Sequence, residues 1–399
     1  IGSSSVKAAI LDGTNVVPGT LVTASFRTRR DGDTAEVDPD ELEGAVRDVA
    51  ERLKWDGVRT LGLTGMGPAW LAMDERGNAL TPIITHQDRR SLQAALELEN
   101  AVGRDEILAI TGNRPTPGGI SSTLIKHFGR NSRPANSYGH VMTWLVRKFG
   151  GPNIIDPSNA GFTGLLDVRQ PGWRWADEVL GVLGITPSML PEIRAGDSVV
   201  ATTGENDLNV PAGLTIVGGF VDGSGPLLLA GAKPGQLVHS AGSTDVLAIA
   251  LTKPMPRDGL LCRPLGTDGF PSRWVSAATH AAGGDAIRWV KDILFPAEPF
   301  EAFADRLPML ATRKTAVVFD PALAGDRQAV QQPAAAWRNL TLATSRDDLA
   351  AAVVQGVIRN HLDRLDRILK LATDAGVDVL PEVVTTGGGS VLAALMHDR

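Results

Sequence analysis

The first part of the 399-residue chain combines short β-rich runs with one helical pattern. Residues 6–11 and 21–27 are rich in β-forming side chains, and Asp12-Gly13 between them is a strong hairpin-turn signal. Asp38-Pro39 predicts a helix start, with Asp as the cap and Pro in the first turn, because apolar residues then recur at helical spacing. A buried-type strand is expected at 58–64. This order predicts an α/β fold built on a mixed sheet.

The rest of the chain falls into two contrasting parts. Residues 90–200 show helical stretches at 91–110 and 139–149 between loops rich in Pro, Gly, Asn and Ser, so we expect an insertion on the first α/β core. The clearest helix runs from Ser345 to Lys370, because Ser345 and Asp348 form a capping signature and apolar residues follow at helical spacing. Val383-Val384 is then a short strand that runs into a glycine cluster.

One stretch of the chain has an internal counterpart. Residues 2–11 can be laid on residues 242–251, with Gly, Ser, Val, Ala and Leu at matched positions. Each copy is a Gly/hydroxyl turn that opens a β-rich strand, and the second copy follows the break at Pro234-Gly235. Chance similarity stays open on this pattern alone. A duplication predicts two domains, 1–234 and 235–399, whose two turns face each other across a cleft.

Composition narrows the classes of protein. With 43% hydrophobic and 21% charged residues, the chain is typical of globular proteins, which argues against disorder and coiled coil. A net charge of −6 without a Lys/Arg cluster argues against a nucleic-acid partner. The single cysteine, Cys262, excludes a disulfide framework and suits a reducing cytoplasm. No apolar run reaches the roughly 18 residues that a membrane-spanning helix needs.

The two Gly/hydroxyl turns suit a polyphosphate, because glycine lets the backbone approach an anion and N–H and hydroxyl groups donate to it. The candidate ligands are Gly2, Ser3, Ser4 and Ser5 in the first turn and Gly242, Ser243 and Thr244 in the second. Lys7 could add positive charge, although a surface charge on the hairpin is the simpler interpretation. A glycine run suits a flat base or ribose sliding past the chain, or else a plain strand-to-helix turn. This run is Gly387, Gly388 and Gly389.

Asp222 is the candidate general base. It follows an apolar strand and is flanked by Gly219 and Gly223, so its carboxylate is expected at an exposed strand end, where α/β proteins build their sites. Phosphoryl transfer to a hydroxyl needs a carboxylate that accepts the proton. An ordinary turn aspartate is the alternative interpretation.

A dense polar cluster, residues 86–90, follows the apolar pair Ile83-Ile84. Asp88 and Arg89 are candidates for binding sugar hydroxyls, with a solvated helix start as the alternative. Trp70 could stack on a sugar face or belong to the core.

Other chemistries are poorly supported. Gly65-Met66-Gly67 imitates a dinucleotide loop but lacks the third glycine and the following helix. The sequence contains no G-x-S-x-G elbow and no Walker A motif, and its seven histidines show no metal-ligand spacing. Metal ligands therefore stay unassigned.

In chain order, these motifs resemble those of the FGGY carbohydrate kinase family over almost the whole chain. The first turn resembles the family's first phosphate motif, residues 64–66 and 86–89 its sugar-side segments, and residues 218–222 the segment with the catalytic aspartate. Residues 240–244 resemble the second phosphate motif, 283–289 the G-G-x-x-x-x-W loop, 319–327 the P-x-L-x-G-E-R block and 386–389 the adenosine motif. Residues 111–113 and 156–160 resemble landmarks of the N-terminal domain.

The resemblance implies two actin-like ATPase (ribonuclease H-like) domains that flank a cleft, a sugar-binding one at 1–234 with a helical insertion at about 90–200 and a nucleotide-binding one at 235–399. It also implies ATP-dependent phosphorylation of a sugar or polyol hydroxyl, with Asp222 as the base and magnesium on the phosphates. The implied nucleotide contacts add Gly284 and Arg288 to the glycine run, and the implied sugar contacts add Met66, Gly67 and Gly223. The expected partner is a small molecule, not a nucleic acid or membrane, and a homodimer is left open.

Departures from the family pattern leave the substrate open. Gly67-Pro68 stand where xylulose-type members carry Met-His and glycerol-type members Arg-Glu, and Gly223 stands where Asn or Gln is usual. Two alternatives follow: a catalytically silent relative that binds sugar or nucleotide, and an actin-like ATPase that acts on a protein partner. The second is disfavoured by the block at 319–327 and the cluster at 86–90. Because Ile1 lies inside an expected strand, we also expect that the sequence is part of a longer kinase, with a metal-associated aspartate upstream and several tens of residues downstream.

Overall fold

A computed structural model describes residues 1–129, 135–266, 273–330 and 332–387. The chain divides into two compact units. Unit 1 comprises Ile1–Gly225 and Arg263–Arg273, and unit 2 comprises Pro226–Cys262 and Trp274–Arg399. Unit 1 therefore includes a segment from the second half of the sequence.

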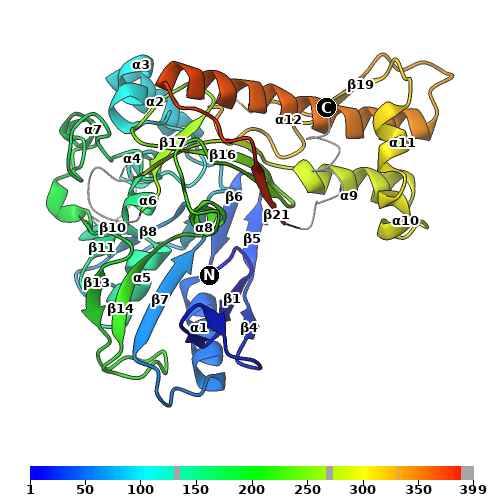
Figure 1. Ribbon diagram of the computed structural model, residues 1–399. Coiled ribbons are helices and arrows are strands. Elements are labelled where there is room, and N and C mark those ends of the chain that lie inside the picture. Colours follow the sequence, from blue (N-terminus) through cyan, green and yellow to red (C-terminus); the bar gives the residue numbers. More distant parts are fainter. Residues whose placement is uncertain (130–134, 267–272, 331, 388–399) are drawn as a thin grey trace. The chain divides into compact units, whose positions relative to one another are not determined.

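The strands of unit 1 form a mixed set of sheets (Figure 1). A five-stranded antiparallel sheet has the order β10-β8-β9-β6-β5, and a three-stranded sheet has the order β13-β14-β7 with β7 and β14 parallel. The expected hairpin at Asp12-Gly13 is confirmed by β2 and β3. The strands are β1 (Ser5–Ala8), β2 (Leu11–Asp12), β3 (Asn15–Val16), β4 (Val22–Ser25), β5 (Thr28–Asp31), β6 (Thr34–Val37), β7 (Thr60–Gly65), β8 (Ala69–Met73), β9 (Ile83–Thr85), β10 (Ser137–His140), β11 (Ile154–Ile155), β12 (Glu192–Ile193), β13 (Val199–Thr202) and β14 (Thr215–Val221).

The helices of unit 1 begin where local capping favours them. Asp38 caps α1 as expected, and its carboxylate accepts a hydrogen bond from the Asp40 N–H at 3.0 Å. The helical stretches expected at 91–110 and 139–149 are present, whereas α4 was expected as loop. The helices are α1 (Pro39–Arg52), α2 (Leu92–Val102), α3 (Arg104–Thr111), α4 (Ser121–Phe128), α5 (Val141–Lys148), α6 (Pro157–Ala160) and α7 (Asp177–Leu183).

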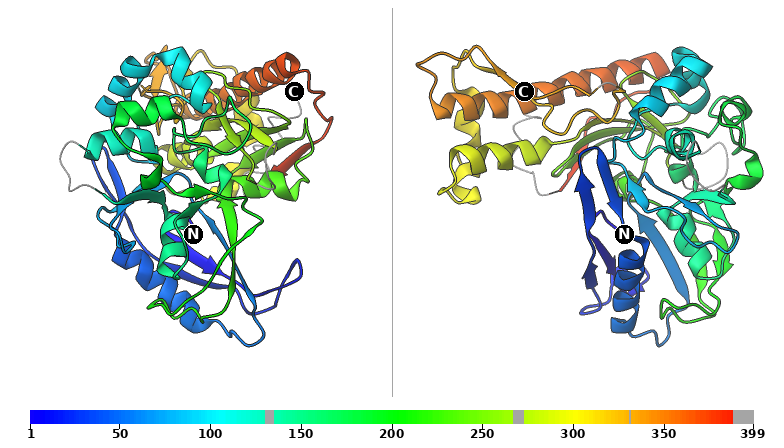
Figure 2. Two further views of the ribbon diagram at one scale, coloured as in Figure 1. Left: turned by 90° about the vertical axis from the view of Figure 1, so that its left-hand side faces the viewer. Right: turned by 180° about the vertical axis from the view of Figure 1, so that it is seen from behind.

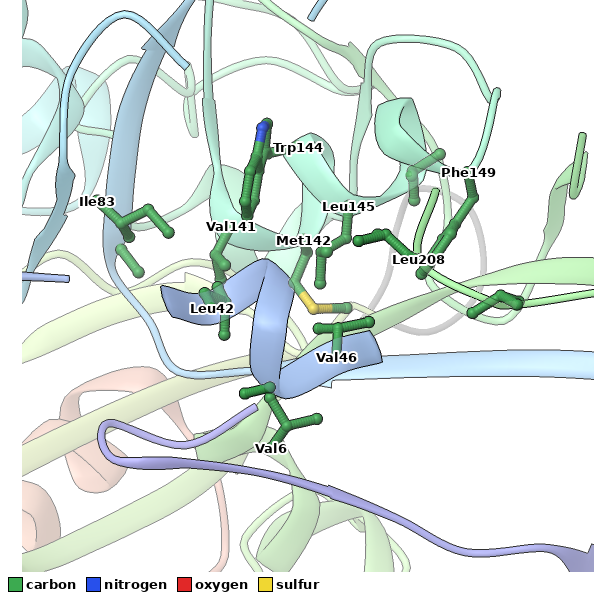
Figure 3. Packing of buried hydrophobic residues seen from close by; sticks show 14 of the residues in the cluster. Val6, Leu42, Val46, Ile83, Val141, Met142, Trp144, Leu145, Phe149 and Leu208 are labelled. Carbon is green, nitrogen blue, oxygen red and sulfur yellow. The ribbon is translucent and has the colours of Figure 1, made fainter. Parts of the chain in front are cut away.

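The core of unit 1 joins helices α1 and α5 to the strands. Figure 3 shows Leu42 and Val46 of α1 packed near Met142 and Leu145 of α5, with Val6 of β1 in the same cluster. Because these apolar faces are removed from water together, they fix β1 and β7 relative to one another. The ends of these strands carry the first turn and part of the candidate site.

Unit 2 is a five-stranded sheet with the order β17-β18-β16-β15-β21, in which β21 runs parallel to β15. The long helix α12 packs on β16 and β18, and Figures 1 and 2 show it running past this sheet. The strands of this part of the chain are β15 (Leu237–Ala241), β16 (Asp245–Leu251), β17 (Leu261–Pro264), β18 (Trp274–His280), β19 (Val318–Asp320), β20 (Ala336–Arg338) and β21 (Val383–Thr386). The last two residues of β17 are assigned to unit 1. The helices are α8 (Gly225–Leu229), α9 (Gly283–Leu294), α10 (Phe300–Ala304), α11 (Leu307–Thr312) and α12 (Arg346–Ala375).

Helix α12 begins at the expected residue. The Ser345 hydroxyl accepts from the Asp348 N–H at 3.2 Å, and the Asp348 carboxylate accepts from the Ser345 N–H at 3.0 Å. This reciprocal pair is the capping box that the sequence predicts. Within the described ranges, with their gaps, no helix has both the length and the apolar character that crossing a membrane requires.

The internal repeat has a structural counterpart in each unit. In the first turn the Gly2 N–H donates to the Ser5 carbonyl at 2.9 Å, and in the second the Gly242 N–H donates to the Thr244 carbonyl at 3.1 Å. Each turn leads into a strand, β1 or β16. The residue before the first turn, Ile1, hydrogen-bonds to Thr64 of β7, and the residue before the second turn, Ala241, lies next to Gly387, which follows β21. Each copy of the repeat is therefore a glycine turn that opens a strand, but the two turns close on different residues, Ser5 and Thr244, which are not matched in the repeat.

Candidate active site

Asp222 lies exposed at the carboxyl end of β14, directly after the buried Val221. Its Oδ1 accepts a hydrogen bond from the Gly223 N–H at 2.7 Å. The strand reaches this point through a bulge, because its register against β7 shifts between Val217 and Phe220. Gly219 makes the bulge possible: its φ is +82°, and a Cβ there would lie 1.8 Å from the Leu63 carbonyl oxygen.

A buried polar chain holds the residue before Asp222. The Val221 N–H donates to Ser158 Oγ at 3.0 Å, and the Ser158 hydroxyl donates in turn to the Asp156 carboxylate. The Asn159 amide donates to the same carboxylate at 2.6 Å. Burial raises the pKa of Asp156, and the hydrogen bonds from Ser158 and Asn159 oppose this rise. The sequence motif 156–160 therefore fixes the end of β14.

His140 extends this chain to α4. Its Nδ1 lies 3.2 Å from Asn159 Oδ1, and its Nε2 lies 3.2 Å from the Ser121 hydroxyl. Burial lowers the pKa of His140 to about 4, so the imidazole is neutral near pH 7. His140 could not be predicted as part of the site, because a lone histidine before an apolar run gives no local signal of its partners.

Arg263 supports the residues after Asp222. Its Nη1 donates to the Ser224 hydroxyl at 2.8 Å and to the Pro264 carbonyl at 3.1 Å, and its guanidinium lies 5.4 Å from the centroid of the Phe162 ring. The side chain is buried, at 3% exposure. Arg263 was not predicted from the sequence either, because its local signal is no more than a charge inside an otherwise apolar run.

The glycines expected beside the substrate lie next to this strand end. A Cβ on Gly67 would come 2.3 Å from Val221 Cγ2, so only glycine fits there without movement. The Met66 N–H donates to the Ile1 carbonyl at 2.8 Å, which places the residue before the first turn beside β7. The structure thus brings the first turn, Gly67 and Asp222 to the same end of the β7–β14 pair.

Three expected sugar contacts are enclosed within unit 1. Met66 and Trp70 are buried in the core, and the Trp70 ring stacks on Phe128 and Tyr138 at centroid distances of 5.5 and 5.8 Å. Asp88 has no exposed surface, because it accepts from the Ala35 N–H at 2.8 Å and pairs with the Arg90 guanidinium. These three side chains are buried within the framework of unit 1, with little or no surface left for a direct contact to a sugar.

Arg89, the other candidate in the polar cluster at residues 86–90, is less buried than Asp88. Arg89 is half-buried, its N–H donates to the Asp33 carbonyl at 2.7 Å, and a Cβ on Gly118 would lie 3.0 Å from its Nη1. The guanidinium therefore lies against a loop of the helical region. Gly223 is exposed beside Asp222.

In unit 2 the second turn is held by the start of α9. The Gly284 N–H donates to the Gly242 carbonyl at 3.1 Å, and the Asp285 N–H donates to the Ser243 carbonyl at 3.2 Å. A Cβ on Gly284 would lie 2.4 Å from the Gly242 carbonyl oxygen, so this approach requires glycine. The Arg327 guanidinium also donates to Thr244 Oγ1 at 3.2 Å. Two segments singled out in the sequence thus meet at one turn.

The other expected nucleotide contacts lie on separate elements. Arg288 is exposed on α9 with its guanidinium 4.6 Å from the centroid of the Phe300 ring, and Lys7 is exposed on β1. Gly387 has a φ of +103°, and a Cβ there would lie 2.3 Å from the Ala241 carbonyl oxygen. Gly388 and Gly389 lie outside the described residues.

One group in the described part of the chain has a spacing that could hold a metal ion: His239, Asp245 and His361, whose ligand atoms lie within 4.8 Å of one another. Two imidazoles and one carboxylate do not suit magnesium, which prefers oxygen ligands. The sequence could not show this group, because His361 is 116 residues away from Asp245.

Comparisons of the sequence and of the structure with known proteins all find carbohydrate kinases. The profile of the FGGY family of carbohydrate kinases, N-terminal domain, matches residues 1–227. Gluconokinase of Bacillus subtilis strain 168 is 24% identical over 389 residues, which cover 90% of this chain and 74% of that protein. Ligand-bound xylulose kinase of Lactobacillus acidophilus superposes with a TM-score of 0.83 at 18% identity, over 99% of this chain and 82% of that one. Plasmodium falciparum glycerol kinase with ADP gives 0.83 at 19% identity, with the same two coverages.

Proposed function

This chain belongs to the FGGY family of carbohydrate kinases, and from that premise we propose that it transfers the γ-phosphate of ATP to a hydroxyl of a sugar or polyol with Asp222 as the general base. The observation that carries the proposal is the placement of Asp222. It is an exposed carboxylate at the carboxyl end of a parallel strand, and buried polar contacts hold the residues before and after it.

The reaction requires one proton transfer from the substrate to the protein. Asp222 takes the proton of the substrate hydroxyl, the hydroxyl oxygen forms a bond to the γ-phosphorus, and the bond from phosphorus to the bridging oxygen breaks as ADP leaves. The Gly223 N–H orients the carboxylate through its hydrogen bond to Oδ1. The rest of the catalysis is positioning and charge stabilisation.

The two glycine turns are the candidate binding groups for the phosphates of ATP. We assign them to the N–H and hydroxyl groups of residues 2–5 and 242–244, with Gly284 keeping the second turn in place. Magnesium bound to the phosphates would offset their negative charge, and no protein ligand is assigned to it. The ADP in the glycerol kinase structure supports a nucleotide substrate for this chain.

The roles of the two units follow from the same premise. We propose that they are the two actin-like domains of the family, unit 1 binding the sugar and unit 2 binding the nucleoside. The compact units first divide between residues 225 and 226. The domain boundary expected from the sequence, between residues 234 and 235, stays a prediction. Gly67, Arg89 and Gly223 remain the candidate sugar contacts.

An acceptor screen tests the proposal. ATP consumption is measured with aldoses, ketoses, sugar acids and polyols, for the unchanged chain, for Asp222→Asn and for Asp12→Asn, an exposed aspartate of the hairpin. We expect one acceptor class to be phosphorylated, with kcat reduced about 10²–10⁴-fold in Asp222→Asn and unchanged in Asp12→Asn.

Three outcomes of this screen would contradict the proposal. Full activity of Asp222→Asn would remove Asp222 as the base. Binding of sugar or nucleotide without turnover would favour a silent relative, and ATP hydrolysis indifferent to every acceptor would favour an actin-like ATPase.

A further inference from the structure

A buried carboxylate lies between two imidazoles behind the second phosphate turn. Asp245 is the first residue of β16 and directly follows Thr244. Its Oδ1 lies 2.5 Å from His239 Nε2 on β15, and its Oδ2 lies 3.1 Å from His361 Nδ1 on α12. Asp245 is 5% exposed, His239 1% and His361 0%. Three elements of unit 2 therefore meet at one carboxylate.

These contacts are hydrogen bonds. An N···O distance of 2.5 Å is too short for two ligands on one cation and suits an N–H donor on a charged acceptor. Burial alone would raise the pKa of Asp245, but the hydrogen bonds from His239 and His361 outweigh burial, so its pKa is lowered. The carboxylate is ionised and takes one imidazole on each oxygen.

The trio lies where it determines the shape of the turn. Asp245 pairs with Ala241 across β15 and β16, so these two residues close the loop that carries Gly242–Thr244. The start of α9 packs against the same residue, because a Cβ on Gly283 would lie 2.5 Å from Asp245 Cβ. A shift of Asp245 would therefore move the turn backbone and the N–H groups on it.

The first turn provides an internal comparison. In the repeat, Ser5 occupies the position that Asp245 has in the second turn. Ser5 is half-buried and its carbonyl accepts the Gly2 N–H, whereas the Gly242 N–H of the second turn donates to the Thr244 carbonyl, so the second turn closes one residue earlier and leaves Asp245 to the strand. The carboxylate and its two histidines are thus an addition specific to the nucleotide side.

We propose that His239, Asp245 and His361 are positioning residues that hold the second turn in the shape that binds the phosphates of ATP. This inference rests on the proposed function, since it takes residues 242–244 as phosphate ligands. It extends the nucleotide site beyond the turn, to two strand residues and one helix residue that support the turn from behind.

The test separates phosphate binding from nucleoside binding. Binding of ATP, ADP and adenosine is measured by titration calorimetry, without any sugar, for the unchanged chain and for His361→Leu and His361→Gln. We expect His361→Leu to raise the Kd of ATP and ADP about tenfold or more and to leave that of adenosine within twofold. His361→Gln keeps a donor for the carboxylate and is expected to restore ATP binding to within about threefold.

A matched control is Val357→Ala, one turn earlier on α12 and equally buried, but apolar. We expect it to lower Tm without changing the ratio of ATP to adenosine affinity. Asp245→Asn is the second variant if His361→Leu does not fold, and the same split between ATP and adenosine is expected for it.

Three results would overturn the inference. His361→Leu could bind ATP as tightly as the unchanged chain, or it could weaken ATP and adenosine equally, which would indicate a general structural role. A transition metal present at one per chain in the purified protein and lost in His361→Gln would replace the hydrogen bonds with a metal site. Because no acceptor is used, failure to find a sugar substrate leaves this result unaffected.

Discussion

At the scale of single residues, Ser158 links a buried carboxylate to the backbone next to Asp222. Its hydroxyl accepts the Val221 N–H and donates to Asp156, so one oxygen serves both groups. An unsatisfied buried donor costs more than the hydrogen bond itself contributes. The position of Asp222 therefore depends on a fully buried serine.

We expect Ser158→Ala to lower the free energy of unfolding by about 1–3 kcal/mol, because the Val221 N–H and Asp156 both lose a partner. We also expect kcat to fall roughly tenfold while the Kd for adenosine is unchanged, since Asp222 is misplaced and unit 2 is untouched. Steady-state kinetics and urea unfolding measure the two effects. Ser122→Ala is the control, because the buried Ser122 hydroxyl has no hydrogen-bond partner among the residues that the structure describes. Equal effects of the two substitutions would argue against the link.

His140 is expected to make the free energy of unfolding depend on pH in the acidic range. Burial lowers its pKa from 6.5 to about 4, so between these values the unfolded chain binds a proton that the folded chain does not. The contribution of neutral His140 to the free energy of unfolding is therefore fully present above pH 6.5 and is lost as the pH falls towards 4. The loss is about 3 kcal/mol, since one pKa unit corresponds to about 1.4 kcal/mol. Urea unfolding at pH 7 and pH 4.5 measures this loss.

His140→Gln should flatten this dependence. Some slope is expected to remain, because burial also lowers the pKa of His280. An unchanged slope in His140→Gln would show that other groups carry the acid sensitivity.

The residue scale also limits what a sequence can reveal. Asp222 could be placed from local signals, since a polar residue after an apolar strand and between glycines is read from a few neighbours. Asp88 could not, because the groups that enclose it, the Ala35 N–H and the Arg90–Glu36 pair, include partners about fifty residues earlier. Trp70 is similar, since its ring partners lie on α4 and β10.

At the scale of elements, the bulge in β14 sets the direction in which Asp222 leaves the sheet. Gly219 makes it at a φ of +82°, with the Leu63 carbonyl where a Cβ would be. A side chain here would force β14 and β7 apart. The bulge is therefore the structural reason for the glycine pair before the candidate base.

Gly219→Ala is expected to destabilise the chain far more than Gly213→Ala. Gly213 has a similar φ of +90°, but nothing lies within 4 Å of its Cβ position, so alanine there costs only the left-handed conformation, about 1–2 kcal/mol. Gly219→Ala adds a backbone clash, and we expect several kcal/mol and a large loss of kcat. Thermal unfolding and kinetics compare the two. Similar losses would mean that the approach to Leu63 relaxes freely.

Elements with their own start signals were predictable, and others were not. Helices α1 and α12 follow from Asp38-Pro39 and from the Ser345–Asp348 pair, because capping is a local interaction. Helix α4 was missed, since its first turn, Ser121–Thr123, is polar in sequence but buried against other elements. The bulge was missed because it exists only relative to β7.

At the scale of the whole molecule, the proposed division of labour predicts where ligands protect the backbone. In hydrogen exchange with mass spectrometry, we expect adenosine to protect unit 2 around residues 283–288. We expect the phosphorylated acceptor sugar to protect unit 1 around residues 65–67 and 221–224 instead. Peptides from α1 serve as the control, since that helix carries no candidate contact. Protection of unit 1 by adenosine would contradict the assignment of the two units.

Unit 1 includes a segment that is synthesised after the first strands of unit 2. Residues 263–273 belong to it, yet β15 and β16 of unit 2 precede them in the sequence. During synthesis, the Arg263 guanidinium reaches Ser224 and the Gly266 carbonyl accepts the Gly196 N–H only after those two strands have left the ribosome. The surroundings of Asp222 are thus among the last parts of unit 1 to assemble, and a nascent chain completes them only after the first two strands of unit 2 have been made.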